Sequence, residues 1–366
     1  MSETASLPIA LALSGGGIRA MVFHLGVLRR LAERGLLERV TKVSTVSGGS
    51  LLVGLMLQEA GMAWPGSDHF INRTLPVLRE KLCTTSLQWG ALRQLRNPLN
   101  IRYLLSRSNL LALALRHEWG VEAALSTLPE SPEWSINGTT AENGKRFRFK
   151  RTDIGDYTLG YANASRFPLA NALAVSAALP GGFGPLRLDA KRFEWRKRPW
   201  DAPSESERRV ELEHECLHLY DGGVYDNLGL EPFFDAGRQR PKFDGHYLIA
   251  SDAGAPLAKG FDHAQLSVFR LKRVADIMSD QARALRVRGF SAYLRAAPAG
   301  GAYIYIDTPV HDTRGEDSAP YVARFPTTLR RLKHAEFDRI VDHGYNVSLR
   351  VEREYGLCGG ARESLA

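Results

Sequence analysis

Cysteine is scarce in this sequence. Among 366 residues there are three, Cys83, Cys216 and Cys358, and no two of them are spaced as Cys-x-x-Cys. A disulfide framework or a structural zinc site needs cysteines paired at short spacing, so the sequence argues against both. We therefore expect a protein of a reducing compartment, the cytoplasm, without a structural metal.

Long apolar runs are missing as well. No stretch reaches the roughly 20 residues that a membrane-spanning helix needs. The apolar run Leu7–Leu13 is short and no basic residues precede it, so a core strand fits it better than a signal peptide. Any contact with a membrane is therefore expected to be peripheral.

Neither sign of charge dominates. Lys and Arg number 48 and Asp and Glu number 40, which gives a formal net charge of +8. This modest excess is spread along the chain and does not indicate a nucleic-acid partner. Hydrophobic residues make up 44%, enough to bury a sizeable core. No repeat or linker divides the chain, so we predict a single domain over residues 1–366.

Strand and helix patterns alternate at the start of the chain. Leu7–Leu13 is a nearly unbroken apolar run, which predicts a buried strand, and Val40–Val46 is predicted as a second strand. Between them a helical face that stops near Gly35 carries Ile18, Met21, Val22, Leu25, Leu28 and Leu31. Another apolar helix follows Ser47-Gly48-Gly49-Ser50. This order predicts a parallel sheet with right-handed crossovers.

The rest of the chain predicts insertions and a helical end. Residues 72–119 have an amphipathic helical pattern, interrupted at Asn97-Pro98, that forms either a cap over a site or an ordinary helical layer. The alternating run Arg146–Phe149 follows Asn143-Gly144 and predicts a hairpin. Further predictions are a helix at 169–179, a polar hairpin or mobile loop at 187–216, strands at 247–250 and 302–306, and helices at 263–295 and 327–355.

A glycine cluster, Ser14-Gly15-Gly16-Gly17-Ile18-Arg19, lies between the first strand and the first helix. Three glycines let backbone N–H groups point toward one place, which suits a phosphate or the oxyanion of an acyl-transfer intermediate. Gly15, Gly17 and Ala20 also match a loose dinucleotide fingerprint. The acidic residue that this fingerprint requires is missing from Lys42-Val43-Ser44-Thr45, so the nucleotide interpretation loses support.

Ser47 lies in Thr45-Val46-Ser47-Gly48-Gly49, between a predicted strand and a predicted helix. The stretch is similar to the GxSxG nucleophile elbow, with Thr45 in place of the first glycine. Serine is also a favoured helix N-cap, so the motif alone leaves both interpretations open. Neighbouring parallel strands end at one edge of a sheet, so the glycine cluster and Ser47 are expected to face one crevice.

A nucleophilic serine needs a proton acceptor, and the ten histidines offer no clear candidate. The alternative is a carboxylate. Asp221-Gly222-Gly223 follows the short apolar stretch Cys216–Tyr220, where the glycines leave the carboxylate uncrowded at a strand end. Partial burial would raise its pKa toward the range useful for a base. A triad completed by a histidine such as His246 is the competing hypothesis.

Together these motifs resemble the patatin-like phospholipases. The resemblance rests on the loop at 14–19, the serine turn at 45–49, the Asp-Gly-Gly at 221–223 and the small-residue helix at 174–180, which occur in the family's order and spacing. It covers residues 7–255, and the stretches 325–332 and 343–345 are similar to the ends of bacterial members. It implies a three-layer α/β/α fold with a mainly parallel central sheet, a helical insertion at about 72–120 and a helical extension at about 263–366.

The resemblance also implies a lipid acyl hydrolase with a Ser-Asp dyad, in which Ser47 is the nucleophile and Asp221 the base, without a cofactor or a catalytic metal. It implies an oxyanion-hole segment made of Gly15, Gly16, Gly17 and Arg19. The two turns would be supported by Thr45, Gly48, Gly49, Gly222 and Gly223. The substrate would be a lipid or phospholipid. Thr45 departs from the family's glycine and affects the fine geometry of the elbow.

Two segments are candidates for lipid contact. Residues 191–200 mix cations with aromatics, which suits an anionic headgroup layer, although the pattern is more typical of a solvated loop. Leu110–Leu115 would either contact acyl chains or pack in the core. Two other functions stay open, a triad esterase or thioesterase and a non-catalytic lipid-binding module on the same scaffold. The sequence does not indicate an oligomeric state.

Overall fold

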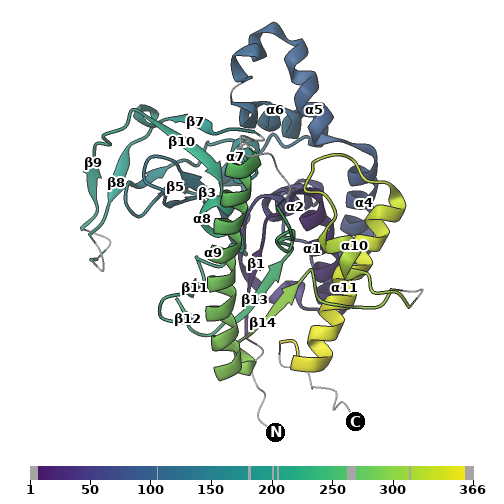
Figure 1. Cartoon of the computed structure of the whole chain (residues 1–366). Helices are drawn as coiled ribbons and strands as arrows, with labels where there is room; N and C mark the ends of the chain where they lie inside the picture. The colour runs from purple at the N-terminus through teal and green to yellow at the C-terminus, as the bar shows by residue number, and fades with distance from the viewer. Residues whose placement is uncertain are drawn as a thin grey trace.

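The computed structural model describes residues 7–104, 106–179, 183–199, 202–203, 206–261, 269–312 and 315–358. In this part of the chain a twelve-stranded sheet runs through the molecule, and helices cover it (Figure 1). The α/β class predicted from the alternation of strand and helix patterns is confirmed. None of the described helices is both long enough and apolar enough to cross a membrane.

Five parallel strands form the centre of the sheet, in the order β14-β13-β1-β2-β3. Their bounds are β1 (Ile9–Leu13), β2 (Val40–Thr45), β3 (Glu133–Thr140), β13 (Tyr247–Asp252) and β14 (Gly301–Tyr305). Leu13 pairs with Thr45 on one side and with Ser251 on the other, so these strands end in step. Helical crossovers bring all five carboxyl ends to one edge, where the glycine loop and Ser47 follow.

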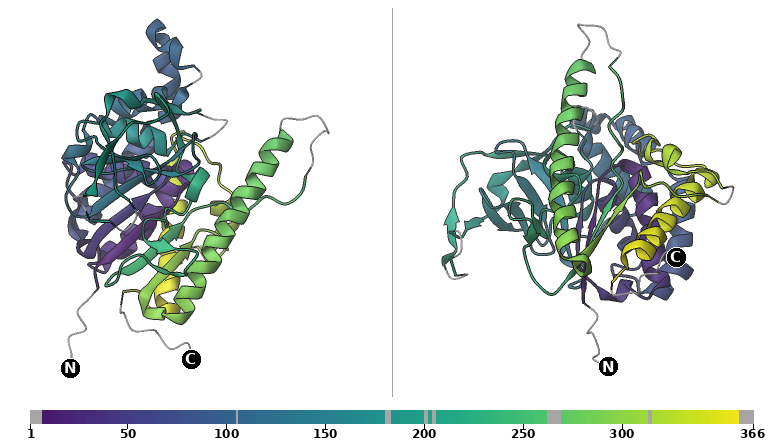
Figure 2. Two further views of the ribbon diagram at one scale, coloured as in Figure 1. Left: turned by 90° about the vertical axis from the view of Figure 1, so that its left-hand side faces the viewer. Right: turned by 60° about the horizontal axis from the view of Figure 1, so that its bottom comes forward.

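The two faces of β1 contact different clusters. Ile9, Leu11 and Leu13 belong to the larger one, which includes residues of α1 (Gly17–Glu33), α2 (Gly48–Glu59) and α11 (His334–Tyr355). Ala10 and Ala12 belong to a smaller cluster that includes Phe290 of α9 (Phe269–Ala296). Burial on both faces is what an unbroken apolar strand predicts. Figure 2 shows that the amino-terminal end of α9 leans away from the body of the molecule.

Two glycines let α1 and α11 cross closely. A Cβ on Gly26 would collide with the Val341 carbonyl oxygen, and one on Gly344 would collide with the Phe23 carbonyl oxygen. The predicted helix at 327–355 begins only at His334. The residues before it are not helical because they lie against the start of α1, where the Ile18 N–H donates to the Thr328 carbonyl over 2.8 Å.

Beyond β3 the sheet continues with antiparallel strands, a larger extension than the sequence predicted (Figure 1). Their bounds are β4 (Arg146–Phe149), β5 (Asp153–Asp156), β6 (Gly160–Asn163), β8 (Trp195–Lys197) and β9 (Arg208–Val210). The predicted hairpin joins β3 to β4, and Gly144 has the positive φ of 66° that suits such a turn. The polar region at 187–216 contains the hairpin β8–β9, so its inserted-hairpin interpretation is correct.

The helical insertion follows β2. It consists of α3 (Ser67–His69), a π-helical turn (Phe70–Thr74), α4 (Leu75–Thr84), α5 (Leu87–Arg93), 3-10 turns (Gln94–Arg96 and Pro98–Tyr103) and α6 (Arg107–Trp119). The break predicted at Asn97-Pro98 is present, and the Asn97 side chain accepts the Leu99 N–H over 3.1 Å. Leu110, Leu111 and Leu115 are buried, so the apolar run in α6 packs in the core.

The remaining elements are short and connect these layers. They are α7 (Leu169–Ser176), β7 (Leu186–Asp189), β10 (Cys216–Asp221), α8 (Gly223–Asp226), β11 (Phe234–Asp235), β12 (Arg240–Pro241), α10 (Ala319–Ala323) and 3-10 turns at 37–39, 125–127, 190–192 and 298–300. The helix predicted at 169–179 therefore ends three residues early, at Ser176. The predicted stop at 180–182 lies outside the described residues.

Candidate active site

Two strands run toward each other along one edge of β3. β2 pairs with β3 in parallel as far as Thr45 opposite Ile136, whereas β10 is antiparallel and ends with Asp221 opposite Gly138. β4 occupies the other edge of β3 at these residues, so β10 continues the row that β2 begins. Because the two strands have opposite directions, their carboxyl ends meet. This pairing brings the residues after β2 next to Asp221.

Ser47 follows β2 in a strained turn. Its φ of 50° and ψ of −117° are rare for any residue other than glycine, and a strained strand-to-helix turn is the geometry of a nucleophile elbow. Gly48 and Gly49 permit it, because a Cβ on either would collide with the Gly17 or the Leu13 carbonyl oxygen. The Ser47 side chain does not cap α2 and is partly exposed, which argues against the N-cap interpretation.

Ser176 hydrogen-bonds to the backbone of Ser47. The Ser47 N–H donates to both the carbonyl and the hydroxyl oxygen of Ser176, over 3.1 and 3.0 Å. The Ser176 hydroxyl in turn donates to the Asn137 carbonyl over 2.7 Å. Asn137 also donates from its side chain to the Thr45 carbonyl. The end of α7 and β3 together therefore fix the peptide group that precedes the serine side chain.

Thr45 has a role that a glycine would not fill. Its hydroxyl accepts the Trp134 indole N–H over 2.9 Å and lies 2.7 Å from the Ser50 hydroxyl. Ser50 is 2.8 Å from the Ser176 hydroxyl, so a continuous chain of buried hydroxyls runs beneath the turn. A glycine at position 45 would leave the buried indole N–H without this acceptor, which is costly. This contact explains the departure from GxSxG.

The glycine loop touches the serine turn. A Cβ on Gly15 would lie 3.0 Å from the Ser47 Cβ. Gly16 and Gly17 have φ values of 144° and 61°, which favour glycine. Gly15 donates its N–H to the Asn227 carbonyl over 3.0 Å, but the N–H groups of Gly16 and Gly17 have no acceptor in the described part of the chain. Backbone N–H groups without an acceptor at the start of α1 are well placed to bind an anion.

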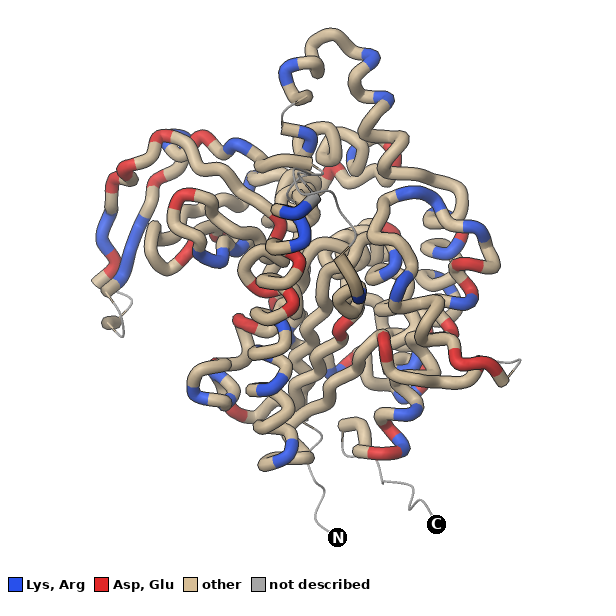
Figure 3. The backbone as a smooth tube through the Cα atoms, viewed as in Figure 1, with Lys and Arg blue, Asp and Glu red and all other residues tan. Residues whose placement is uncertain are grey.

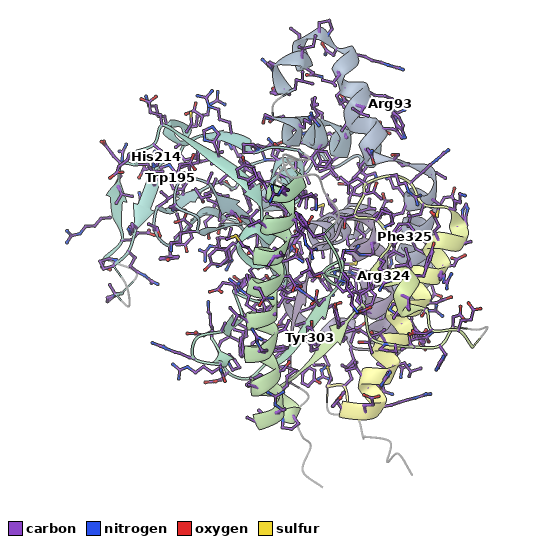
Figure 4. All side chains as sticks on the ribbon, in the orientation of Figure 1. Arg93, Trp195, His214, Tyr303, Arg324 and Phe325 are labelled. Atoms are coloured by element: carbon purple, nitrogen blue, oxygen red, sulfur yellow. The ribbon has the colours of Figure 1, made fainter. Side chains whose placement is uncertain are left out.

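Arg19 supports this loop from behind. Its guanidinium is buried and donates to the carbonyls of Phe325 and Ala253, over 2.6 and 3.1 Å (Figure 4 labels Phe325). A Cβ on Gly16 would lie 3.0 Å from the Arg19 Nη2. Burial lowers the pKa of Arg19 to about 10. Of the predicted oxyanion segment, Gly16 and Gly17 thus have free donors, whereas Gly15 and Arg19 donate to the protein itself.

Asp221 ends β10 in a buried position, with 3% of its surface exposed. Burial raises the pKa of its carboxyl to about 7, while the Gly223 N–H, 2.7 Å from Oδ1, and the nearby Ser47 hydroxyl act in the opposite direction. Gly222 is required here, because a Cβ on it would collide with the Asn137 carbonyl oxygen. The carboxyl group is therefore fixed beside Ser47 with a pKa close to neutrality.

Asn227 is one of the four residues after Asp-Gly-Gly that the sequence suggests could shape a site, without a specific role. Its backbone carbonyl oxygen accepts the Gly15 N–H. A Cβ on Gly15 or on Gly223 would collide with its side-chain Oδ1. Asn227 thus lies between the glycine loop and the turn after Asp221. The only sequence signal is its nearness to the Asp-Gly-Gly motif, and that does not reveal a contact with the first turn of the chain.

His24 has a structural role. It is buried in α1, and burial lowers its pKa to about 4, so its ring is neutral. Nε2 lies 3.0 Å from the Ser14 carbonyl and Nδ1 lies 2.8 Å from the Ser251 hydroxyl. The ring therefore ties the glycine loop to the end of β13 and takes no part in a contact with Ser47.

The proposed triad with His246 finds no geometric support. His246 precedes Tyr247 at the amino end of β13, whereas the serine turn lies at the carboxyl edge of the sheet. In the described ranges no histidine hydrogen-bonds to Ser47 or Asp221. His263 lies outside those ranges. Nor do the described residues contain a group of three or more His, Cys, Asp or Glu that could hold a metal ion.

The cations of residues 191–200 are exposed, in keeping with the solvated loop that the pattern favours. Trp195 is buried and donates its indole N–H to the Ala190 carbonyl over 2.9 Å (Figure 4 labels Trp195). Lys191 and Arg196 form ion pairs with Glu215 and Glu194. Trp200 lies outside the described residues. With an aromatic side chain turned inward and cations paired, the segment offers little to a lipid layer.

Known proteins resemble this chain in sequence and in fold. The sequence model of the patatin-like phospholipases matches residues 11–234, more than half of the chain. No curated protein is significantly similar to it. Human GIVD cytosolic phospholipase A2 has a similar structure, with a TM-score of 0.57 and 15% identity, over 96% of this chain and 59% of the human one.

Two further solved structures are similar. Human GIVD cytosolic phospholipase A2 in complex with methyl gamma-linolenyl fluorophosphonate gives a TM-score of 0.53 at 16% identity, over 95% of this chain and 57% of that chain. VipD from Legionella pneumophila gives a TM-score of 0.41 at 16% identity, over 96% and 67%. This chain thus spans little more than half the length of the human protein, and the likeness to the human structures concerns the fold.

Proposed function

Because this chain belongs to the patatin-like phospholipase family, we propose that it hydrolyses acyl esters of lipids with Ser47 as nucleophile and Asp221 as base. Membership of the family supports lipid acyl hydrolase activity in general. The observation that carries the finer proposal is the buried Asp221 carboxyl, with a pKa of about 7, next to a serine in a strained turn. A base with this pKa can accept a proton near neutral pH.

The reaction proceeds in two steps. The Ser47 Oγ attacks the acyl carbonyl carbon while its proton passes to the Asp221 carboxylate. The N–H groups of Gly16 and Gly17 bind the oxyanion that forms, and one such donor typically contributes about 3–4 kcal/mol to the rate. The carbon–oxygen bond to the alcohol then breaks, and the alcohol or lysolipid leaves with the proton from Asp221.

Water completes the cycle. It gives a proton to the ionised Asp221 and its oxygen attacks the acyl-enzyme carbonyl. Collapse of the second oxyanion releases the fatty acid, and Ser47 regains its proton from Asp221. In this mechanism neither step uses a metal or a cofactor.

A substrate with an acyl chain is supported by two observations. Leu179 and Val224 lie close in sequence to Ser176 and Asp221, and about half of each side chain is exposed. A structural neighbour, the human enzyme, was solved with a fluorophosphonate that carries a linolenyl chain. We therefore propose a lipid ester, with phospholipids and lysophospholipids as the first substrates to examine.

The test combines an active-site probe with lipid turnover. A fluorophosphonate probe is expected to label the wild type but not Ser47→Ala, because the probe bonds to the nucleophilic oxygen. Asp221→Asn should lower lipid turnover by about 10²–10⁴-fold, the usual contribution of a general base. The control is Ser279→Ala, which removes an exposed hydroxyl on α9.

Mass spectrometry of lipids incubated with wild type and Ser47→Ala would identify the substrate in the same experiment. Unchanged turnover in Ser47→Ala would overturn the dyad. Loss of labelling in a single histidine variant, His263 included, would favour the triad instead. A wild type that neither reacts with the probe nor changes any lipid would leave the non-catalytic lipid-binding module.

A further inference from the structure

A lobe of the helical insertion stands out from one end of the molecule. It comprises α5 and the 3-10 turns after it, residues 87–104, and we call it the apical lobe (top of Figure 1). Figure 2 shows in a second view that it projects beyond the sheet and the other helices. Only one side of α5 packs against the body, where Leu87, Gly90 and Ala91 are buried.

The apical lobe exposes several large apolar side chains. Five large apolar side chains are at least 48% exposed: Trp89, Leu92, Leu99, Ile101 and Leu104. The first two come from α5, the next two from the second 3-10 turn and the last from the residue that follows it, so all five lie on the same projection. Scattered exposed apolar residues need no explanation, but a cluster on a projecting lobe is typical of an interaction site.

The charge of this region has one sign. Between Lys81 and His117 there is no Asp or Glu, whereas Arg93, Arg96 and Arg102 lie within the apical lobe and are exposed. Figure 3 shows blue segments and no red ones along the lobe, in contrast to the mixed colours of the rest of the tube, and Figure 4 labels Arg93 there. Exposed apolar groups flanked only by cations complement an anionic bilayer.

The base of the apical lobe is hydrogen-bonded to segments that form the candidate active site. On one side, the Gln88 N–H donates to the Leu329 carbonyl and the Thr328 hydroxyl donates to the Gln88 side chain, over 3.1 and 3.0 Å. Thr328 itself accepts the Ile18 N–H beside the glycine loop. The lobe is thereby linked to the amide donors through one residue.

A second link lies on the other side. The Ser106 hydroxyl donates to the Pro185 carbonyl over 2.6 Å, and the Ser108 N–H donates to the Phe183 carbonyl over 3.0 Å. These acceptors belong to the connection between α7 and β7, and α7 ends in Ser176, which holds the Ser47 N–H. The residues that follow the lobe are thus hydrogen-bonded to the segment that precedes β7.

We infer that the apical lobe is the surface by which this protein docks on an anionic lipid bilayer, with Trp89, Leu99 and Ile101 entering the interface. Arg96 and Arg102 contact the headgroups, whereas Arg93 is paired with Glu118 of α6. This inference adds a docking surface to the proposed function. Only the reason for docking, access to a lipid substrate, rests on that function. The lobe of a second copy fits less well, because it has no acids that would pair with these cations.

The α9 helix provides a matched comparison. Leu271 and Met278 are as exposed as the apolar residues of the apical lobe. Asp276 and Asp280 lie among them, and Asp276 pairs with Lys272. An apolar surface with acids of its own is less suited to anionic lipid, so α9 serves as the control for exposed apolar area.

Docking is measured without turnover, by cosedimentation of Ser47→Ala protein with vesicles. One set of vesicles is phosphatidylcholine alone and the other contains about one third phosphatidylglycerol. Arg96→Gln with Arg102→Gln should lower partitioning to the anionic vesicles about 30-fold, at roughly fivefold for each basic residue, and the loss should shrink at high salt. Leu99→Ser with Ile101→Ser should lower it at least about tenfold.

Two control variants complete the design. Leu271→Ser with Met278→Ser, and Arg192→Gln with Arg196→Gln, should bind vesicles like the parent protein. Equal loss in these controls, unchanged binding in the lobe variants, or a parent that binds neither vesicle would overturn the inference. The lobe variants in the Ser47-containing protein should keep fluorophosphonate labelling. Absent labelling in the wild type would count against the proposed function alone, since the vesicle result does not depend on it.

Discussion

In the proposed mechanism, burial of the Asp221 carboxyl provides a base at the expense of stability. Its burial at the end of β10 disfavours the charged form, which raises its pKa from 3.8 to about 7. The ionised group that the reaction needs is therefore the less stable form in the folded protein. Since the folded pKa is the higher one, this group stabilises the fold at low pH, and that contribution is lost as the pH rises toward 7.

The same pKa predicts the pH dependence of the reaction. Below about pH 7 the carboxyl is mostly protonated and cannot accept the Ser47 proton, so kcat/KM for a soluble ester should fall about tenfold per pH unit. Above this pH the rate should level off. Initial rates between about pH 5 and pH 9 measure the midpoint. A midpoint near the ordinary aspartate value would contradict the burial argument.

Single residues were predicted from sequence to different extents. Ser47, Asp221 and the three glycines stand in motifs whose spacing is local, so their chemistry can be read along the chain. The roles of Ser176, Asn227 and Thr45 arise only from contacts with distant segments, such as the Ser47 N–H or the Trp134 indole. No local pattern contains these contacts, and for this reason Thr45 seemed only a departure from a motif.

At the scale of elements, the crossing of α1 and α11 depends on the absence of side chains. Gly344→Ala would drive a Cβ into the Phe23 carbonyl, and overpacking of this kind typically costs about 1–3 kcal/mol. Alanine favours a helix by up to about 1 kcal/mol over glycine, so the net change should still be destabilising. Urea unfolding of purified protein gives the difference.

Asn346→Ala is the control for this crossing, since it lies two residues further along the same helix and is only partly buried. It should change the unfolding free energy by less than about 1 kcal/mol. If Gly344→Ala were as stable as the wild type, the helices would have to separate without cost, and the close crossing would not be a constraint on the sequence.

The elements themselves were predicted where their pattern is intrinsic. An unbroken apolar run predicted β1 within two residues, because a strand buried on both faces needs one, and β2 was predicted within one residue. The stretch before α11 was wrongly predicted as helix, since its helical pattern is overridden by the Thr328 contact with α1. The length of the antiparallel extension was missed because strands of three or four residues, such as β8 and β9, are too short to produce a period.

At the scale of the whole molecule, the end of the chain supports its beginning. Phe325 and Thr328 contact the glycine loop and the start of α1, and α11 packs along α1. This arrangement supports a single domain over residues 1–366, which stays a prediction. Opposite charges are interspersed over most of the body, as Figure 3 shows, so no part is held away from the rest by like charge.

A chain that ends at residue 324 tests the single domain. It lacks the carbonyl that holds Arg19 and the helix that covers α1, so it should lose both cooperative unfolding and fluorophosphonate labelling. The full chain should show one transition in urea, followed by tryptophan fluorescence and by circular dichroism. A truncated protein that unfolds cooperatively and still reacts with the probe would mean that the core is an independent domain.

Because β2 and β10 meet on β3, the reactivity of Ser47 reports whether these strands have paired correctly. A slip of one residue in β10 would turn its last carboxylate to the opposite face of the sheet and leave the hydroxyl without an acceptor. Such molecules would keep nearly all of their secondary structure. An active-site titrant reacts only with chains in which β2 and β10 are both paired with β3 in the correct register. The reactive fraction of a preparation therefore measures the fraction of correctly folded chains.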